Sequence, residues 1–311
     1  MLTQVDAVES ALKSLNHQTI RLPLGRDPGT ALTLLKRQTA DAVFNLCETI
    51  DEDASLSWHA AALLELLNIP FTGSPSSALM LTADKVLTKR LLSTEAILTP
   101  GYAVCRNLAD FNPESLRFPV IVKPQFEDAS IGIDQESIFE TPNQLRRGIA
   151  AFNRQFGPVL VEEYIAGREF NISLFGFPKP SVMPLAEIDF SDFPDSLYPI
   201  VGYRAKWEPS SFEYQHTPRY FNDRIPKHLA SELERTSRIC FTLFGLRDYG
   251  RVDVRVDAED RIYVLEVNAN PCLSPDAGLA AAVQQSGESY QDLVAELAGW
   301  AVMRKKNGTS G

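Results

Sequence analysis

The sequence has few of the features by which several classes of protein are recognised. It contains only 4 cysteines and 4 histidines in 311 residues. No two cysteines form a CxxC pair and no two histidines form an HxxxH pair, so we expect neither a disulfide framework nor a zinc site of the HExxH type. Scattered free thiols are typical of a reducing compartment, and we therefore predict a cytoplasmic protein.

Other absences exclude further classes. No apolar run approaches the roughly 18 residues of a membrane span, and the first ten residues have no basic stretch that would begin a secretory signal. The chain has 40 acidic and 30 basic side chains and a net charge of -10, so we expect no nucleic-acid partner. Neither a GxxxxGK[ST] nor a GxGxxG motif occurs, which argues against P-loop and Rossmann folds.

Hydrophobic side chains make up 44% of the chain, which is enough for a sizeable core. The pattern of elements predicts an α/β protein of about two or three domains, and residues 1–83 form the first predicted domain. We expect helices over 3–15 and 58–67 and strands over 19–22 and 41–47. This alternation favours an open, mostly parallel sheet, and because a helix comes first we expect the domain to lack its first strand.

The second predicted domain covers residues 84–164 and the third covers 165–306, with a disordered tail at 307–311. In the second we expect helices over 84–92 and 143–152 and strands over 118–123 and 159–163. In the third we expect a strand over 170–175, a helix over 227–244, a hairpin over 250–267 and a helix starting at Ser289. The proline- and aromatic-rich stretch 178–218 is either a mobile substrate lid or a loop packed on its own aromatic side chains.

The predicted hairpin carries a line of polar side chains. Strand alternation places Arg251, Asp253 and Arg255 on one face and three valines on the other. If the turn sets the register, Arg251 faces Glu266, Asp253 lies diagonally from Glu266, and Asn268 continues the same face. Two carboxylates and an amide are the oxygen ligands that Mg²⁺ prefers. The alternative is a solvated strand face on which Arg251 pairs with Glu266.

Lysines and a linker strand add a second group of candidates. Lys123 ends an apolar strand and Lys85 lies near the start of a helix, so each can hold a phosphate or simply extend its charge into solvent. The loop 127–132 can cover phosphates with its backbone N–H groups. The apolar strand 159–165 leads to a hinge at Ala166-Gly167, where the backbone can bind an adenine edge or the strand can merely end at the surface.

Together these segments resemble the ATP-grasp enzymes, and most of all their D-alanine–D-alanine ligase branch. The resemblance covers residues 41–300 and rests on the order and spacing of short motifs. They are Asp84-Lys85, FPVIVKP (118–124), VLVEEYIAGREF (159–170), RAKW (204–207) and YGRVDV…YVLEVNANP (249–271). The resemblance implies an ATP-grasp fold with two lobes around the nucleotide, and an ATP-dependent ligase that forms an amide through an acyl phosphate.

The resemblance also implies roles for individual residues. Lys85, Lys123 and Lys206 would hold the ATP phosphates, with Ser130 in the phosphate loop. Glu162, Glu163 and Ile165 would line the adenine, and Glu169 would bind the ribose. Asp253, Glu266 and Asn268 would carry Mg²⁺, with Mn²⁺ as an alternative. Arg251 would stabilise the oxyanion, and Lys206 would be the second catalytic residue. The candidate substrate residues are Trp207, Asn270, Cys272 and Ser274.

The chain departs from the family where the first substrate is bound. The family's ammonium-binding glutamate lies before the point at which this sequence starts, its network serine is here Ala129, and its network tyrosine is here Trp207. A glycine of the oxyanion loop is replaced by Cys272, and a serine that contacts the second substrate falls at Ala277. The resemblance therefore implies that ATP chemistry is retained and amino-acid recognition is changed.

These inferences leave three hypotheses. The leading one is an ATP-dependent carboxylate–amine ligase acting on amino-acid or peptide substrates other than D-alanine alone. The second is a genuine D-alanine–D-alanine ligase, and the third is an ATP-binding protein without catalytic activity. The resemblance further implies a homodimer through the first domain, with no nucleic-acid or membrane partner.

Overall fold

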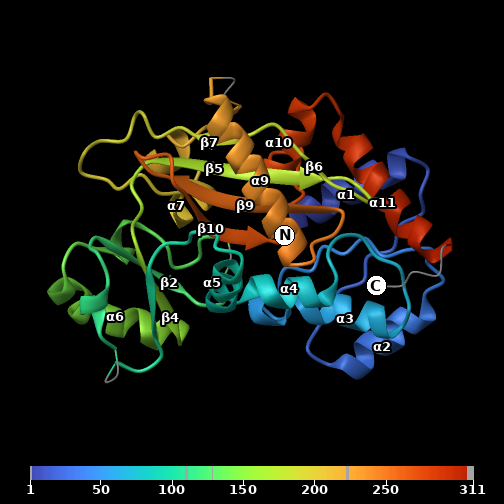
Figure 1. Ribbon diagram of the computed structural model, residues 1–311. Coiled ribbons are helices and arrows are strands. Elements are labelled where there is room, and N and C mark those ends of the chain that lie inside the picture. Colours follow the sequence, from blue (N-terminus) through green and yellow to red (C-terminus); the bar gives the residue numbers. More distant parts are fainter. Residues whose placement is uncertain (1, 109–110, 128, 222–223, 307–311) are drawn as a thin grey trace.

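The computed structural model describes residues 2–108, 111–127, 129–221 and 224–306, so the predicted disordered tail at 307–311 lies outside the described residues. In Figure 1 the larger of two antiparallel sheets crosses the upper part of the molecule, the smaller lies below it at the left, and a helical segment with α2 (Pro28–Arg37), α3 (Trp58–Leu66) and α4 (Ser76–Ala83) lies at the lower right. No helix among the described residues combines the length and apolar character needed to cross a membrane.

The smaller sheet belongs to the predicted second domain. Its strands run in the order β1 (Tyr102–Cys105), β4 (Val159–Glu163), β2 (Val120–Pro124) and β3 (Ile138–Phe139). Helix α6 (Pro142–Phe156) starts with a capping box between Thr141 and Gln144 and packs Leu145 and Ile149 on the valines of β2 and β4. This packing holds the ends of β2 and β4, and with them Lys123 and Glu162, in one place.

The larger sheet belongs to the predicted third domain. Its main path is β10 (Ile262–Asn268), β9 (Tyr249–Val256), β5 (Arg168–Phe175), β7 (Ala186–Ile188) and β8 (Arg219–Phe221), and β6 (Ser181–Val182) pairs with β5. Helix α9 (Lys227–Leu243) buries Leu229 and Leu233 against β5 and β9. Helices α10 (Gly278–Gln285) and α11 (Tyr290–Lys306) bury a second cluster that includes Tyr249.

The first segment is mainly helical. It contains α1 (Leu2–Ser14), α2 (Pro28–Arg37), α3 (Trp58–Leu66) and α4 (Ser76–Ala83), and α5 (Lys85–Thr94) follows. The strand expected over 19–22 is wrong, because these residues have no regular structure. The strand expected over 41–47 is reduced to one parallel bridge between Val43 and Phe71, made by hydrogen bonds with Pro70 and Thr72. The predicted parallel direction is therefore present at a single residue pair.

A buried ion pair connects this segment to the larger sheet. Both nitrogens of the Arg304 fork donate to Asp248 at 2.8 Å, and one also donates to the carbonyl of Phe71 at 2.6 Å. The second carboxylate oxygen of Asp248 accepts the N–H of Gly73 at 2.8 Å. The last helix, the start of β9 and the loop before α4 are thereby held together.

The predicted proline-rich stretch 178–218 contains short elements. Besides β6 and β7 it includes α7 (Tyr203–Trp207) and α8 (Phe212–Gln215). Phe193 lies with its ring centroid 5.2 Å from Phe190 and 5.6 Å from Phe212, so part of the stretch does pack on its own aromatic side chains. Outside this stretch, the described residues also include the 3-10 helices η1 (Ala54–Leu56), η3 (Pro113–Ser115) and η4 (Gln135–Ser137).

Candidate active site

The hairpin β9–β10 carries the predicted polar face, but in a register that differs from the expected one. Glu266 lies directly opposite Asp253, and Asn268 lies opposite Arg251. The prediction that Arg251 faces Glu266 is therefore wrong. The register shifts between Val264 and Glu266, because Val264 and Val267 are both buried in the core although they are three residues apart. The bulge brings the two carboxylates closer together than simple alternation would.

Arg251 and Asp253 form a two-pronged contact on this face. Nε of Arg251 donates to one carboxylate oxygen at 2.7 Å and Nη2 donates to the other at 2.9 Å. Burial opposes the charged form of Arg251, but the Asp253 carboxylate outweighs it and raises the pKa of the guanidinium. Arg251 is therefore a fixed cation at the end of β9.

Lys206 reaches the same face from α7. Burial lowers the pKa of its ammonium and the nearby Arg251 lowers it further, whereas Glu266, Asp253 and Glu169 raise it. Four residues from two separate sequence motifs thus influence the pKa of one lysine. The structure brings Lys206 together with the hairpin carboxylates.

The hairpin face has the donor set of a hard cation. Asp253 and Glu266 offer carboxylate oxygens, and Asn268 offers an amide oxygen that also accepts the N–H of Asn270 at 3.0 Å. The described part of the chain contains no group of three or more His, Cys, Asp and Glu side chains arranged for a metal. Two carboxylates and an amide suit Mg²⁺, which keeps several ligand positions for water and phosphate oxygens, so these residues fit the ion.

A buried cluster of lysines surrounds Glu162 at the end of β4. One carboxylate oxygen lies 2.6 Å from Nζ of Lys123 and the other lies 2.8 Å from Nζ of Lys89. Burial favours the neutral acid, but the Lys123 and Lys89 charges prevail and lower the pKa of Glu162 to about 2. Lys85 donates from its ammonium to the carbonyl of Glu127 in the phosphate loop. Sequence reasoning missed Lys89, although its spacing of four residues from Lys85 on α5 places both on one helix face.

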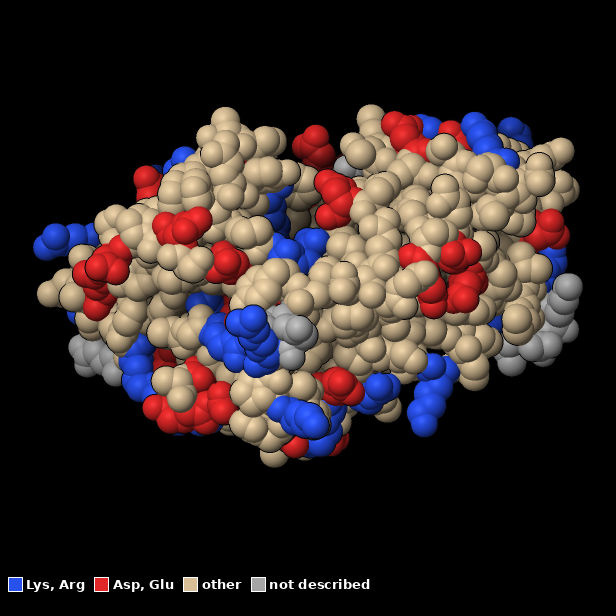
Figure 2. Space-filling model, turned by 90° about the horizontal axis from the view of Figure 1, so that it is seen from above, with Lys and Arg blue, Asp and Glu red and all other residues tan. Residues whose placement is uncertain are grey.

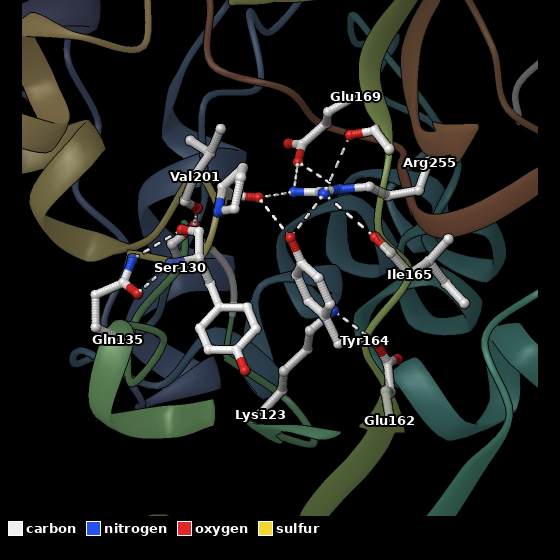
Figure 3. A network of polar contacts seen from close by, with 12 residues as sticks. Lys123, Ser130, Gln135, Glu162, Tyr164, Ile165, Glu169, Val201 and Arg255 are labelled. Carbon is white, nitrogen blue, oxygen red and sulfur yellow. Dashed lines mark hydrogen bonds and ion pairs between the residues drawn. The ribbon is translucent and has the colours of Figure 1, made fainter. Parts of the chain in front are cut away.

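The hinge after β4 is organised by Arg255 (Figure 3). Its Nε and Nη2 donate to Glu169 at 3.0 and 2.8 Å, and its Nη1 donates to the carbonyl of Ile165 at 3.2 Å. Arg255 also donates to the hydroxyl of Tyr164 and to the carbonyl of Pro199. The expected ribose residue and the expected adenine residue are therefore connected by one arginine. Alternation correctly placed Arg255 on the face of Arg251, but no motif assigned it to the nucleotide site.

Glu163 points away from this cluster. Its carboxylate accepts from the backbone N–H and the side chain of Arg117 at 2.6–3.0 Å, and it packs against Gly101. Successive residues on a strand face opposite sides, so Glu162 and Glu163 cannot both direct their side chains to one base. Any contact of Glu163 with adenine would come from its backbone.

The stretch after residue 197 is bound to the phosphate loop region. The hydroxyl of Ser130 donates to the carbonyl of Val201 at 2.8 Å, and the amide of Gln135 exchanges two hydrogen bonds of 2.9 Å with the backbone of Tyr198. The indole N–H of Trp207 donates to the carbonyl of Ala129 at 2.9 Å. The two positions that lack hydroxyls thus still contact each other, through a backbone group.

Three of the four candidate substrate residues, Asn270, Cys272 and Ser274, lie on the loop between β10 and α10, and the fourth, Trp207, lies at the end of α7. Asn270 accepts the hydroxyl of Tyr249 at 2.8 Å and donates to the carbonyl of Cys47 at 3.2 Å. The thiol of Cys272 lies 3.3 Å from the hydroxyl of Ser274. The side chain of Gln4, from α1, accepts the N–H of Leu273 at 2.9 Å. All three candidates are brought together, and the first segment contacts their loop.

Two further residues lie near this loop and were not found from the sequence, Glu48 of the first segment and Arg219 of β8. Gln4 donates to Glu48 at 2.8 Å, which places a carboxylate of the first segment beside the loop. Burial and the charge of Arg251 lower the pKa of the Arg219 guanidinium on β8, whereas Asp253 and Asp276 raise it. No motif surrounds either residue. Seen from above, basic side chains are recessed in a hollow near the centre of the surface, with acidic side chains along its rim (Figure 2).

Comparison with known proteins gives a consistent result. Residues 103–298 match the family model described as "D-ala D-ala ligase C-terminus". The chain is 32% identical to the uncharacterized protein y4sG of Sinorhizobium fredii, over 93% of this chain and 84% of that protein. It is 31% identical to a D-alanine–D-alanine ligase of Carboxydothermus hydrogenoformans, over 94% of this chain and 90% of that enzyme.

A solved structure extends the likeness to the whole fold. The crystal structure of a D-alanine–D-alanine ligase from Bacillus anthracis superposes with a TM-score of 0.77 and 20% sequence identity. The superposition covers 99% of this chain and 94% of that one. At this identity the match concerns the architecture alone, which is that of the ATP-grasp fold expected from the motifs.

Proposed function

The chain belongs to the D-alanine–D-alanine ligase family of ATP-dependent, ADP-forming ligases with the ATP-grasp fold, and from that membership we propose that it joins a substrate carboxylate to an amine on an amino acid or peptide. One observation carries the proposal. Arg251, Asp253, Glu266 and Asn268 share one face of the hairpin, and Lys206 is directed to it from α7.

The proposed reaction has two steps. An oxygen of the substrate carboxylate attacks the γ-phosphorus of ATP, which releases ADP and leaves an acyl phosphate. The amine then attacks the acyl carbon, and collapse of the tetrahedral adduct expels inorganic phosphate and leaves the amide. The ammonium releases one proton before it attacks, and a second proton passes from the nitrogen to the departing phosphate. Carboxylate, ammonium and ATP therefore give amide, ADP, hydrogen phosphate and one free proton.

The residues of the site have distinct roles in this proposal. Lys85, Lys123 and Lys206 bind the phosphates from the two lobes, and Glu169 binds the ribose while Arg255 fixes its orientation. The pair Asp253 and Glu266, with Asn268, would hold Mg²⁺, which offsets charge on the transferred phosphoryl group. Arg251 stabilises the oxyanion of the tetrahedral adduct, since its guanidinium is held rigidly by Asp253.

We further propose that the substrates differ from two molecules of D-alanine. Ala129 and Trp207 stand where the family has hydroxyl groups, and their mutual contact uses the indole N–H and a carbonyl instead. The indole N–H of Trp207 is already used by this carbonyl, and the methyl side chain of Ala129 forms no hydrogen bond. Neither side chain can therefore replace the hydroxyl groups of the family's network with its glutamate. A genuine D-alanine–D-alanine ligase is the second candidate, which the relative from Carboxydothermus hydrogenoformans favours.

A screen of ADP release tests these proposals. The purified chain is supplied with ATP, Mg²⁺ and a panel of amino acids and small peptides, singly and in pairs, and ADP is measured with product masses. We expect ADP release to require an amine and a carboxylate other than D-alanine alone. Release with D-alanine alone, giving D-alanyl-D-alanine, would favour the second candidate. Bound ATP with no amine-dependent release would contradict ligase activity.

A further inference from the structure

Arg219 lies in the first position of β8, paired with Ile188 of β7, and its side chain extends to the start of α10. A Cβ built on Gly278 would lie 3.6 Å from Nη2, 3.7 Å from Cζ and 3.7 Å from Nε of Arg219. Nearly equal distances to three atoms of a planar group mean that Gly278 covers the face of the guanidinium. The N–H groups at the edge of the guanidinium therefore point away from Gly278 and are not covered by it.

The charge of Arg219 has no counterion of its own within the described residues. Its Nε is buried and donates to no atom of that part of the chain. Asp253 acts on it, but both oxygens of this carboxylate already accept from Arg251, and Asp276 is exposed. Buried donors without an acceptor are rare and costly in folded proteins, so a ligand that supplies the acceptor would explain why this one is present.

The surroundings of Arg219 favour an anion. No side chain caps the start of α10 at Ala277, and the first N–H groups of a helix have no partner within the helix. Arg251, which stands beside the acyl carbon in the proposed reaction, lies close enough to Arg219 to lower its pKa. A planar guanidinium next to free backbone N–H groups has the geometry of a two-pronged carboxylate site.

The position of Arg219 separates this site from the phosphate end of the cleft. The phosphate candidate Lys123 comes from β2 of the smaller sheet, and Lys85 comes from α5 and contacts the carbonyl of Glu127 in the loop that follows β2. Arg219 lies on the larger sheet next to the loop 269–277, on which the substrate candidates are found. An anion held there stands on the substrate side of Arg251.

We propose that Arg219 binds the carboxylate of the amine substrate, and that this enzyme therefore accepts amino carboxylates in preference to amines that lack an acid group. The inference rests on the proposed function. In the product, the same carboxylate becomes the C-terminal carboxylate of the new peptide. Product peptides consequently bind with their free C-terminus at Arg219.

Binding of paired peptides to the ADP-loaded chain tests the inference without turnover. We would titrate Gly-Gly, L-Ala-L-Ala, D-Ala-D-Ala and D-Ala-D-Ser, each beside its C-terminal amide, into the chain saturated with ADP and Mg²⁺, and measure the dissociation constants by calorimetry. We expect the acid of the best peptide to bind roughly tenfold to a hundredfold more tightly than its amide.

Three variants refine this experiment. Arg219→Met should abolish the difference between acid and amide, whereas Arg219→Lys should keep part of it because the charge remains. Arg235→Met, which removes an exposed arginine of α9, is the matched control and should behave as the unchanged chain. ADP affinity should stay within about twofold in every variant.

The outcomes separate the two proposals. Equal binding of acid and amide by the unchanged chain, while amines still stimulate ADP release, overturns the inference and leaves the proposed function intact. A preference for the acid that survives in Arg219→Met also overturns it. If no peptide binds and no amine stimulates ADP release, both proposals are wrong.

Discussion

The two ends of the candidate active site differ in whether their charged side chains are paired within the protein. At the phosphate end, Glu162 is buried between Lys89 and Lys123, and at the hinge Glu169 is held by Arg255. At the substrate end, Arg219 has a buried N–H without an acceptor in the described residues. The buried charges of the phosphate end are thus paired within the protein, although the side-chain oxygen of Gln125 there has no partner in the described residues. The substrate end instead has a charge that a ligand would have to satisfy.

This difference bears on what each end can tolerate. Removing one partner of a buried ion pair leaves an uncompensated charge, which destabilises a fold strongly. Removing a buried charge that has no partner in the protein takes away a cost and leaves stability similar or higher. We therefore expect substitutions at the phosphate end to act first on folding, and substitutions at the substrate end to act on ligand preference.

The largest expected effect is that of Glu162→Ala. This change leaves Lys89 fully buried beside Lys123 without a counterion. We expect the free energy of unfolding to fall by about 3–5 kcal/mol, measured by urea denaturation at neutral pH. The control Glu232→Ala removes an exposed partner of Arg235 and should change stability by about 0.5 kcal/mol at most. Equal effects of the two variants would contradict the phosphate-end account.

The Glu162 carboxylate should also make the stability of the fold depend on pH. The pKa of Glu162 is lowered to about 2, below its ordinary value near 4.5, so its contribution to stability is complete above pH 4.5 and is lost as the pH falls towards 2. In Glu162→Gln the group no longer titrates. Urea midpoints measured between pH 5 and 2.5 should therefore decline more steeply for the unchanged chain than for Glu162→Gln. Parallel declines would show that this residue does not contribute.

Catalysis should respond at Arg251, which lies between the two ends. Arg251→Lys keeps a positive charge beside Asp253 but loses the two-pronged geometry. We expect kcat to fall about 10²–10³-fold, equivalent to roughly 2.7–4 kcal/mol of barrier, with the KM for ATP changed only a few-fold. The comparison with Arg235→Lys controls for the substitution itself. An unchanged kcat would remove Arg251 from the oxyanion role.

At the substrate end we expect a smaller change in the free energy of unfolding, with the opposite sign to that of Glu162→Ala. Arg219→Met replaces a half-buried charge, whose Nε lacks an acceptor in the described residues, by an apolar side chain of similar length. We expect the free energy of unfolding without ligands to stay unchanged or to rise by about 1 kcal/mol. Urea denaturation of both proteins checks this. A loss of stability comparable to that of Glu162→Ala would mean that Arg219 is bound within the fold, and the contrast between the two ends would fail.

The smallest effect is expected at Trp207, whose indole N–H reaches Ala129 from a half-exposed side chain. Trp207→Phe removes this hydrogen bond and keeps an aromatic ring. We expect a loss of about 0.5–1 kcal/mol or less in the unfolding free energy, and faster proteolytic cleavage near residue 207. Trp58→Phe, outside this contact, is the control for the loss of an indole. An unchanged cleavage rate would show that the contact does not hold this segment.

The sequence predicted the polar face of the hairpin better than it predicted the two ends of the site, and the reason is physical. Strand alternation and the motif spacing placed Arg251, Asp253 and Asn268 on one face, because these depend on local geometry. The register of Glu266 was mispredicted, since the bulge follows from burying both Val264 and Val267 in a core shared with α9. Lys89 has one local signal, its spacing of four residues from Lys85 on α5, which sequence reasoning missed. Arg219 has no local signal, because its environment comes from segments distant in the chain.

The first segment was the least predictable. Residues 19–22 have strand-like composition but no regular structure, and only Val43 of the expected strand 41–47 pairs with a neighbour. A parallel strand depends on partners that lie far away in sequence, so its pattern alone does not decide whether a sheet forms. The roles assigned here to individual residues of the active site remain predictions that the variants above test.

Transfer of oxygen from substrate to phosphate is the most direct test of the proposed acyl-phosphate route. The chain would be incubated with ATP, Mg²⁺ and an amino acid identified by the ADP-release screen, carrying ¹⁸O in its carboxylate, and the inorganic phosphate would be analysed by mass spectrometry. We expect one ¹⁸O in the phosphate for each amide formed, because the carboxylate oxygen that attacks ATP leaves with the phosphate. Amide formation with phosphate free of ¹⁸O would contradict it.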